Sequence, residues 1–233
     1  MALLHRAFHL AHWLFPAGGV CLEFGVGPGN SLAWQAGRLH RQYTHSRLVG
    51  FDSFLGLPQE APGVWRPERH AAGRWLASRR QAEERIEGLA LGRIRLVDGW
   101  FSDTLTPELR NEIGQAIFIN VDVDLYASTI EVLDFVGPLL QPGTIIYWDD
   151  WKDPHDRHHE PWGEHRAWDE WYGRRPAGLA VETLEVNAVL QRAMIVTAAR
   201  ESTLSHDHLV AIRYRALILG EMSWEDLVNG KLP

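Results

Sequence analysis

The sequence predicts an α/β fold in which a doubly wound, mostly parallel sheet ends in an antiparallel C-terminal edge. Between residues 20 and 148, apolar segments typical of strands alternate with segments of helical periodicity, which favours parallel strands joined by right-handed helical crossovers. Two more strand-like segments follow near the C-terminus and favour antiparallel pairing. The 233 residues, 45% of them hydrophobic and 23% charged, are enough for a sizeable core. We therefore expect a single domain over 1–233, with an N-terminal helix in 1–18 and a C-terminal appendage in 206–233.

Local periodicity and capping signals define the expected elements. Leu4, Phe8 and Ala11 recur at helical spacing in the N-terminal segment. Thr106 and Pro107 mark a helix start, because threonine is a favoured N-cap and proline fits the first helical position. In chain order, the elements after the N-terminal helix are expected to be strand Val20–Val26, helix Ser31–His40, strand Arg47–Asp52, helix Arg74–Leu89, strand Arg93–Val97, helix Pro107–Ile113, strand Ala116–Val121, helix Ser128–Leu140 and strand Gly143–Trp148.

The pattern changes after Asp150, where residues 151–162 form a polar loop. We interpret this loop as solvated and not as a metal site, because its spacing matches no zinc motif. Its candidate ligands are Asp153, His155, Asp156, His158, His159 and Glu160. The remaining elements are expected to be a short helix near Glu164–Tyr172, the edge strands Ala180–Val186 and Arg192–Ala198, and a helical tail over His206–Leu227.

Composition and charge exclude several classes of function. The 23 Lys and Arg against 30 Asp and Glu give a net charge of −7, so we expect no nucleic-acid partner and no membrane partner, but a small molecule. The single cysteine, Cys21, excludes an internal disulfide and a cysteine-based zinc site, and it fits a cytoplasmic protein. No apolar stretch has the length of a membrane span, and charged and histidine residues interrupt the N-terminal segment as a secretion signal.

A glycine-rich turn after the first strand indicates a cofactor site. Small residues there let a ligand approach the backbone at the N-terminus of the next helix. Asp52 ends the second strand, with Ser53 beside it, and a carboxylate at that place can accept both hydroxyl hydrogens of a ribose. A tight turn alone would also explain the glycines, but the following acid favours a nucleoside cofactor. The turn residues assigned to this site are Gly25, Gly27, Asn30 and Ser31.

Two features favour S-adenosylmethionine over a nicotinamide dinucleotide. Glu23 stands inside the first strand, where a carboxylate can receive the ammonium of an amino-acid tail and would repel a pyrophosphate. The Tyr-x-x-x-Lys pair of short-chain reductases is absent, because neither lysine has a tyrosine four positions before it. After the third strand, Asp98 and Gly99 offer an acceptor for the adenine amino group, and Trp100 offers an aromatic face for its ring, although Trp100 fits the core equally well.

Four acids follow the fourth and fifth strands, namely Asp122, Asp124, Asp149 and Asp150. Ligands of open α/β sheets bind outside the carboxyl ends of the strands, so these acids are expected to face one crevice. Gathering carboxylates is costly unless a cation lies among them. Oxygen ligands without cysteine indicate Mg²⁺, with Mn²⁺ or Ca²⁺ as alternatives. Helix capping or pairing with arginine is the alternative reading of each acid. In a continuing strand, Asp122 and Asp124 would face the same side.

Five motifs in this order resemble the macrocin-type O-methyltransferases. They are Glu23-Phe-Gly-Val, Gly50-Phe-Asp-Ser-Phe-Leu-Gly-Leu-Pro58, Gly99-Trp-Phe-Ser-Asp-Thr-Leu105, Asp122-Val-Asp-Leu-Tyr-Ala-Ser-Thr129 and Asp149-Asp150. The resemblance spans roughly residues 20–172. It implies a Rossmann-like class I, metal-dependent enzyme that transfers a methyl group from S-adenosylmethionine to a sugar hydroxyl of an antibiotic.

The resemblance also implies roles for single residues. Asp122, Asp149 and Asp150 match the family's metal ligands, and Asp124 matches its general base. The family's cofactor contacts fall on Glu23, Ser31, Asp52 and Gly99. The chain departs from the pattern at Val123, where a glycine is common, and in the Trp- and His-rich loop after Asp150, so the acceptor is defined only as a hydroxylated small molecule.

Two other functions stay open. Asp149-Asp-Trp-Lys152 resembles the Asp-x-x-Lys of catechol methyltransferases, but that motif belongs after the fourth strand, where Leu125 takes the place of the lysine. A non-catalytic module that binds S-adenosylmethionine is the rival from another class. A homodimer is the base-rate expectation. Several tryptophans lie near the inferred mouth of the site, and an aromatic platform for the acceptor or a contact between subunits would explain them equally well. They are Trp148, Trp151, Trp162, Trp168 and Trp171.

Overall fold

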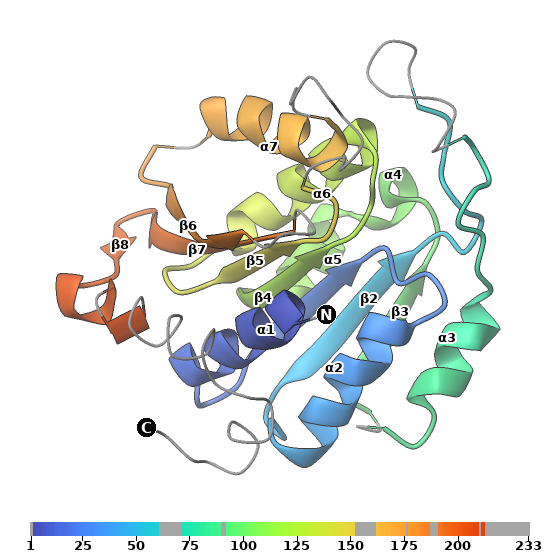
Figure 1. Ribbon diagram of the computed structural model, residues 1–233, viewed down its shortest axis with the longest axis horizontal. Helices are drawn as coiled ribbons and strands as arrows, with labels where there is room; N and C mark the ends of the chain where they lie inside the picture. The colour runs from blue at the N-terminus through green and yellow to red at the C-terminus, as the bar shows by residue number, and fades with distance from the viewer. Residues whose placement is uncertain are drawn as a thin grey trace.

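A computed structural model describes residues 2–60, 71–89, 92–151, 162–175, 177–186, 191–209 and 211–212. Its strands form one sheet with the order β3-β2-β1-β4-β5-β7-β6, and β8 pairs with β7 (Figure 1). The strands are β1 (Val20–Phe24), β2 (Arg47–Asp52), β3 (Ile94–Asp98), β4 (Ala116–Val121), β5 (Ile145–Trp148), β6 (Ala180–Val186), β7 (Arg192–Ala199) and β8 (Ser202–Thr203). The helices are α1 (Ala2–Leu14), α2 (Asn30–Arg41), α3 (Arg79–Ile86), α4 (Phe101–Thr104), α5 (Pro107–Ile113), α6 (Tyr126–Val136), the 3-10 turn η1 (Gly137–Leu139) and α7 (Gly163–Gly173).

The sheet confirms the predicted fold class. Strands β1 to β5 pair in parallel, whereas β7 runs antiparallel to both β5 and β6. Apolar side chains of α1, α2 and α3 pack on one face of the sheet, and those of α5, α6 and α7 pack on the other. Strands β1, β4 and β5 between these two layers are buried at every residue, which is why they read as near-continuous apolar segments in the sequence.

The strand order determines where a ligand can bind. β1 lies between β2 and β4, so the chain leaves β1 toward one side of the sheet and later returns to pair on its other side. A crevice opens at such a reversal, beyond the carboxyl ends of the strands. Here those ends are followed by Gly25 after β1 and by Asp122 after β4.

Most predicted elements are confirmed, and several within a residue or two of their bounds. The expected helix over Arg74–Leu89 is wrong at both ends, because α3 spans only Arg79–Ile86. Ser78 begins that helix with a reciprocal capping box to Gln81, and Trp75 before it has a φ of 60°, which a helix excludes. Helix α6 begins earlier than expected and gives way to η1, while α4 and β8 were not predicted.

The tryptophans near the end of β5 belong to the core, which corrects both expected roles for them. Trp148 and Trp151 are 0% exposed, and Trp168 and Trp171 are 5% and 8% exposed. Their rings contact one another between the sheet and α7. Neither an acceptor platform nor a subunit contact therefore explains these four residues, and Trp162 lies half-buried at the start of α7.

Two predictions fall largely outside the described part of the chain. The six candidate ligands of the polar loop lie in residues 152–161, and of the tail only 206–209 and 211–212 are described. Among the described helices, none has the length and apolar character required to cross a bilayer.

Candidate active site

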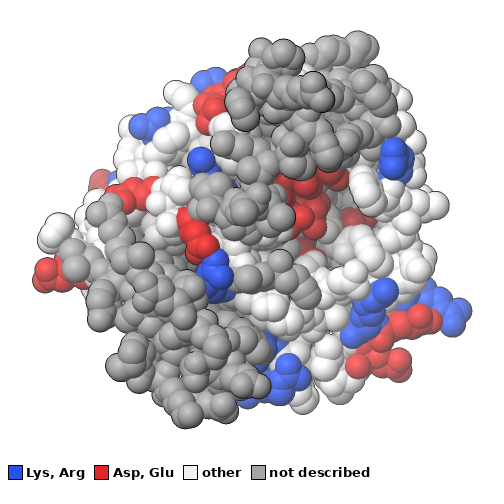
Figure 2. Space-filling model, viewed as in Figure 1, with Lys and Arg blue, Asp and Glu red and all other residues white. Residues whose placement is uncertain are grey.

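A cavity of about 770 Å³ lies at the carboxyl ends of the strands. Its wall joins the glycine turn after β1, the segment after β2, the start of α4 and the acids after β4 and β5. Acidic side chains gather near the middle of the face shown in Figure 2. The cavity brings most of the predicted cofactor and metal residues into one site, namely Gly25, Gly27, Asn30, Ser31, Asp52, Ser53, Gly99, Trp100, Asp122, Asp124, Asp149 and Asp150.

Gly25 allows the close approach of β1 and β4 beneath the cavity. Its φ is 85°, and a Cβ atom there would stand 1.7 Å from the carbonyl oxygen of Asp122. No side chain can replace glycine without moving the backbone that carries Asp122. Gly25 therefore allows the turn at the cofactor end of the cavity to lie directly against the backbone of Asp122 at the acidic end.

Asp52 organises the two loops around the cofactor end. Its Oδ2 accepts the N–H of Gly27 at 2.7 Å, and its Oδ1 accepts the N–H of Phe54 at 2.7 Å. A carboxylate has about four acceptor positions, so two remain for ligand hydroxyl groups. This arrangement is suited to the predicted ribose contact.

Glu23 lies behind the cavity wall and does not line it in the described structure. The side chain is 0% exposed. Oε1 accepts the hydroxyl of Ser31 at 2.7 Å, and Oε2 contacts the side-chain amide of Gln35. Burial raises the pKa of Glu23 to about 7 against the opposing effect of these hydrogen bonds. Of Glu23 and Ser31, it is Ser31 that lines the cavity.

Asp98 does not line the cavity either. Its Oδ2 lies 3.5 Å from Nη1 of Arg79 at the start of α3, and the side chain is 42% exposed. Gly99 and Trp100, which follow it, line the cavity wall. The contact of Asp98 with adenine therefore stays a prediction.

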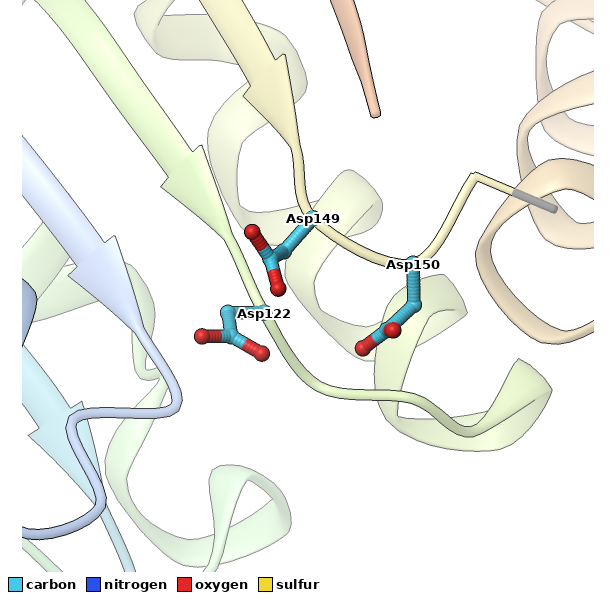
Figure 3. A group of neighbouring side chains, drawn as sticks. All are labelled: Asp122, Asp149 and Asp150. Carbon is cyan, nitrogen blue, oxygen red and sulfur yellow. The ribbon is translucent and has the colours of Figure 1, made fainter. Parts of the chain in front are cut away.

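Three carboxylates converge at the acidic end. Asp122, Asp149 and Asp150 each offer an oxygen, and these oxygens lie within 4.8 Å of one another. Figure 3 shows the three side chains pointing into the same space beside the ends of β4 and β5. Burial and repulsion, above all by Asp149 and Asp150, raise the pKa of Asp122 well above its ordinary value. A cation at this position would relieve the repulsion.

Two side chains donate hydrogen bonds to the same oxygen of the Asp149 carboxylate. The hydroxyl of Tyr147 donates to its Oδ1 at 2.6 Å, and the side-chain amide of Gln191 donates to the same oxygen at 2.5 Å. Such contacts fix the orientation of a ligating carboxylate. They leave Oδ2 available to the cluster.

Asp124 lies in a tight turn beyond the predicted end of the strand, so strand alternation does not determine which side it faces. β4 ends at Val121, and the N–H of Leu125 approaches the carbonyl of Val123 at 2.5 Å. Asp124 has a φ of 58°, in the left-handed region that aspartate tolerates better than most residues. Asp124 and Asp122 nevertheless both line the cavity.

Sequence analysis missed two buried acids that hold the loops of this site. Oε2 of Glu60 accepts the N–H of Ala127 at 3.0 Å, which fixes the segment after β2 to the start of α6. Glu164 accepts one N–H from each of the two segments that carry the four aspartates. The only sequence signal for Glu164 was its place at the start of a predicted helix, which does not indicate what its side chain contacts.

Exposed apolar side chains surround part of the cavity mouth. Trp75 and Leu76 line the wall and are 64% and 70% exposed, and Leu55 nearby is 58% exposed. Residues 73 and 74 are held to Leu57 by two backbone hydrogen bonds of 2.9 and 2.8 Å. The mouth thus joins an apolar rim to an acidic floor.

A family model described as a methyltransferase domain matches residues 22–151. The curated protein 8-demethyl-8-(2,3-dimethoxy-alpha-L-rhamnosyl)-tetracenomycin-C 4'-O-methyltransferase of Streptomyces olivaceus is 33% identical over 141 residues, which are 57% of this chain and 53% of that protein. The chain thus matches about half the length of this relative.

Solved structures share the fold. The O-methyltransferase NovP superposes with a TM-score of 0.66 and 20% identity over 83% of this chain and 79% of that chain. The calicheamicin methyltransferase CalS11 superposes with a TM-score of 0.64 and 23% identity over 82% of this chain and 77% of that chain. These likenesses agree with the predicted class I arrangement of sheet and helices.

Proposed function

Because the chain belongs to the family of methyltransferase domains, we propose that it is an S-adenosylmethionine-dependent and Mg²⁺-dependent O-methyltransferase of a hydroxylated small molecule. One observation carries the proposal: the ribose-type acid Asp52 and the three converging aspartates line the same cavity. A methyl donor and an activated acceptor oxygen must meet in such a space. The name of the Streptomyces relative supports a sugar of a natural product as the acceptor.

The cofactor end has the groups that S-adenosylmethionine requires. Asp52 has acceptor positions left for the ribose hydroxyls, and Ser31 and Asn30 lie on the wall at the start of α2. Trp100 provides an aromatic face on the same wall. The ammonium of the amino-acid tail would reach Glu23 only through Ser31, which lies between Glu23 and the cavity.

The acidic end fits Mg²⁺. Its donors are carboxylate oxygens, the ligand type that this cation prefers, and their mutual repulsion favours a bound cation. When bound there, Mg²⁺ would lower the pKa of an acceptor hydroxyl. Asp122, Asp149 and Asp150 would hold it, and Tyr147 and Gln191 would keep Asp149 in place.

Asp124 is the proposed general base. It takes the proton of the acceptor hydroxyl, and the oxygen attacks the methyl carbon of the sulfonium as the carbon–sulfur bond breaks. The products are a methyl ether, S-adenosylhomocysteine and a proton on Asp124. Bringing the two reactants together in one cavity provides much of the rate acceleration.

Transfer of a labelled methyl group from S-adenosylmethionine to rhamnosides and to catechols tests the proposal. We expect transfer to a rhamnoside with Mg²⁺, none in EDTA, and recovery when Mg²⁺ is restored. Full transfer in EDTA would contradict the metal role. Transfer to catechols alone would favour the phenolic acceptor. S-adenosylhomocysteine binding without transfer to either class would favour the non-catalytic module.

A further inference from the structure

Glu164 joins the two backbone segments that carry the four aspartates of the site. Its Oε1 accepts the N–H of Val123 at 3.0 Å, and its Oε2 accepts the N–H of Asp150 at 3.1 Å. The side chain is 0% exposed and comes from the first turn of α7. We propose that Glu164 is a positioning residue that holds the aspartates at the separation required for a divalent cation. The inference rests on the function proposed above.

Glu164 spans a gap that the sheet leaves open. The last backbone hydrogen bond between the two segments runs from the N–H of Asp149 to the carbonyl of Val121 at 3.0 Å. Beyond it no backbone hydrogen bond joins the two segments in the described structure, since one enters the tight turn at Asp124 and the other continues to Trp151. The two contacts of Glu164 take the place of the strand-to-strand hydrogen bonds that end there.

The position of each contact bears directly on the aspartates. Val123 lies between Asp122 and Asp124, so the first contact fixes the backbone on which both side chains are carried. Asp150 is itself one of the converging acids and follows Asp149, so the second contact fixes that pair. A shift of either segment would change the distances among all three metal-ligand candidates.

The chemistry of the bridge explains why a glutamate stands there. Two N–H donors require two acceptor oxygens on one side chain, and a glutamine has one oxygen and an amide that donates. An aspartate has the two oxygens but is one methylene shorter. The glutamate bears an electrostatic cost for this role, because burial and repulsion by Asp150 raise its pKa well above its ordinary value.

Metal binding to matched variants of the whole chain tests the inference. Glu164→Gln keeps the size and loses one acceptor, and Glu164→Asp keeps the charge and loses the reach. Asp169→Asn is the control, because this 55% exposed acid of α7 forms an ion pair with His165 at 3.3 Å and does not line the cavity. The readouts are Mn²⁺ affinity by electron paramagnetic resonance and S-adenosylhomocysteine affinity by calorimetry.

We expect both Glu164 variants to bind Mn²⁺ about 10- to 100-fold more weakly, the usual effect of losing an outer contact of a metal site. S-adenosylhomocysteine affinity should stay unchanged in both, and Asp169→Asn should match the wild type in both readouts. Wild-type Mn²⁺ affinity in both Glu164 variants would overturn the inference and leave the proposed function standing. So would a loss in Glu164→Gln alone, because charge and not reach would then matter.

Two further outcomes separate the inference from the function. A wild-type chain that binds S-adenosylhomocysteine but no Mn²⁺ would contradict the metal role itself, and the inference with it. If the Glu164 variants do not fold, amide hydrogen exchange of the wild type decides. The N–H groups of Val123 and Asp150 should then exchange slowly and together, and rapid exchange of either would overturn the bridge.

Discussion

Asp52 serves two purposes with one carboxylate, since it fixes the backbone at Gly27 and Phe54 and faces the cavity. We expect Asp52→Ala to bind S-adenosylhomocysteine about 10- to 100-fold more weakly, because charge-assisted hydrogen bonds of about 1.5–3 kcal/mol are lost. Calorimetry measures the change. Glu84→Ala, which removes an exposed acid of α3 paired with Arg80, should bind as the wild type. Undiminished affinity in Asp52→Ala would remove this residue from the cofactor site.

Asp124→Asn separates proton removal from metal binding. Asparagine keeps the shape and tolerates the φ of 58° at this position, so the turn should persist. Turnover should fall by about a hundred- to ten-thousandfold, the usual span for a general base. Mg²⁺ and S-adenosylhomocysteine affinities should stay unchanged, and a higher pH should partly restore the rate. A pH–rate profile beside Mg²⁺ titrations provides the measurement, and a loss of Mg²⁺ affinity would make Asp124 a ligand instead.

The sequence alone located the acids at strand ends but not the groups that hold them. Parallel strands end at one edge of a sheet, so Asp122 and Asp149 could be placed together from the element order alone. Glu164 could not, because its partners are backbone N–H groups 41 and 14 residues earlier in the chain. Side-chain chemistry shows in a sequence, whereas a buried acceptor for a distant backbone donor depends on the tertiary fold.

Helix α1 carries buried histidines that should make its packing sensitive to acid. Burial lowers the pKa of His9 from 6.5 to about 3, and it lowers the pKa of His12 to about 4. A histidine whose folded pKa is lowered stabilises the fold fully above pH 6.5 and loses that contribution as the pH falls toward the folded value. His9 lies 9% exposed against Tyr43, on a helix that packs on β4, β5 and β7.

We therefore expect the free energy of unfolding of the wild type to fall more steeply with acid than that of His9→Gln. Between pH 6.5 and 4 the two slopes should differ by about 1.4 kcal/mol per pH unit, the value for one proton. Urea unfolding at several pH values measures both. Carboxyl groups with raised pKa values, such as Glu23, act in the opposite direction in both proteins, so the difference isolates His9. Parallel curves would contradict the prediction.

Elements with strong local signals were predicted more closely than those set by tertiary contacts. Helix α5 was placed at Pro107–Ile113 because Thr106 caps it through the N–H of Leu109, a contact within one turn. The region before α3 has helical periodicity but forms a turn, because its backbone forms hydrogen bonds with Leu57 beside the cavity. The four tryptophans were assigned to the mouth by their place in the chain, yet packing between β5 and α7 buries them.

The whole molecule should gain stability when the acidic cluster is neutralised. In the metal-free protein, the half-buried Asp122 is repelled by Asp149 and Asp150, so Asp122→Asn should melt at a higher temperature than the wild type in EDTA. Mg²⁺ at about a hundred times its dissociation constant should raise the melting temperature of the wild type by about 5–10 °C. The variant should lose this response.

Thermal unfolding with and without Mg²⁺ provides the measurement. Glu112→Gln, which removes an exposed acid paired with Arg95, is the control and should respond to Mg²⁺ as the wild type does. An equal Mg²⁺ shift in Asp122→Asn would show that the cation stabilises the chain elsewhere. A lower melting temperature of that variant in EDTA would show that the wild-type Asp122 carboxylate stabilises the fold through local contacts by more than its repulsion destabilises it.

The pairing of β5 has a consequence for how the chain is made. The segment shared with the methyltransferase family ends at residue 151, yet β5 pairs on its far side with β7, which begins only at Arg192. During translation, the apolar strand Ile145–Trp148 therefore leaves the ribosome with one edge uncovered. An open apolar edge can template pairing with neighbouring chains. Within the shared segment β5 is therefore an edge strand, and we expect the nascent chain to be open to such pairing until Arg192–Ala199 has left the ribosome.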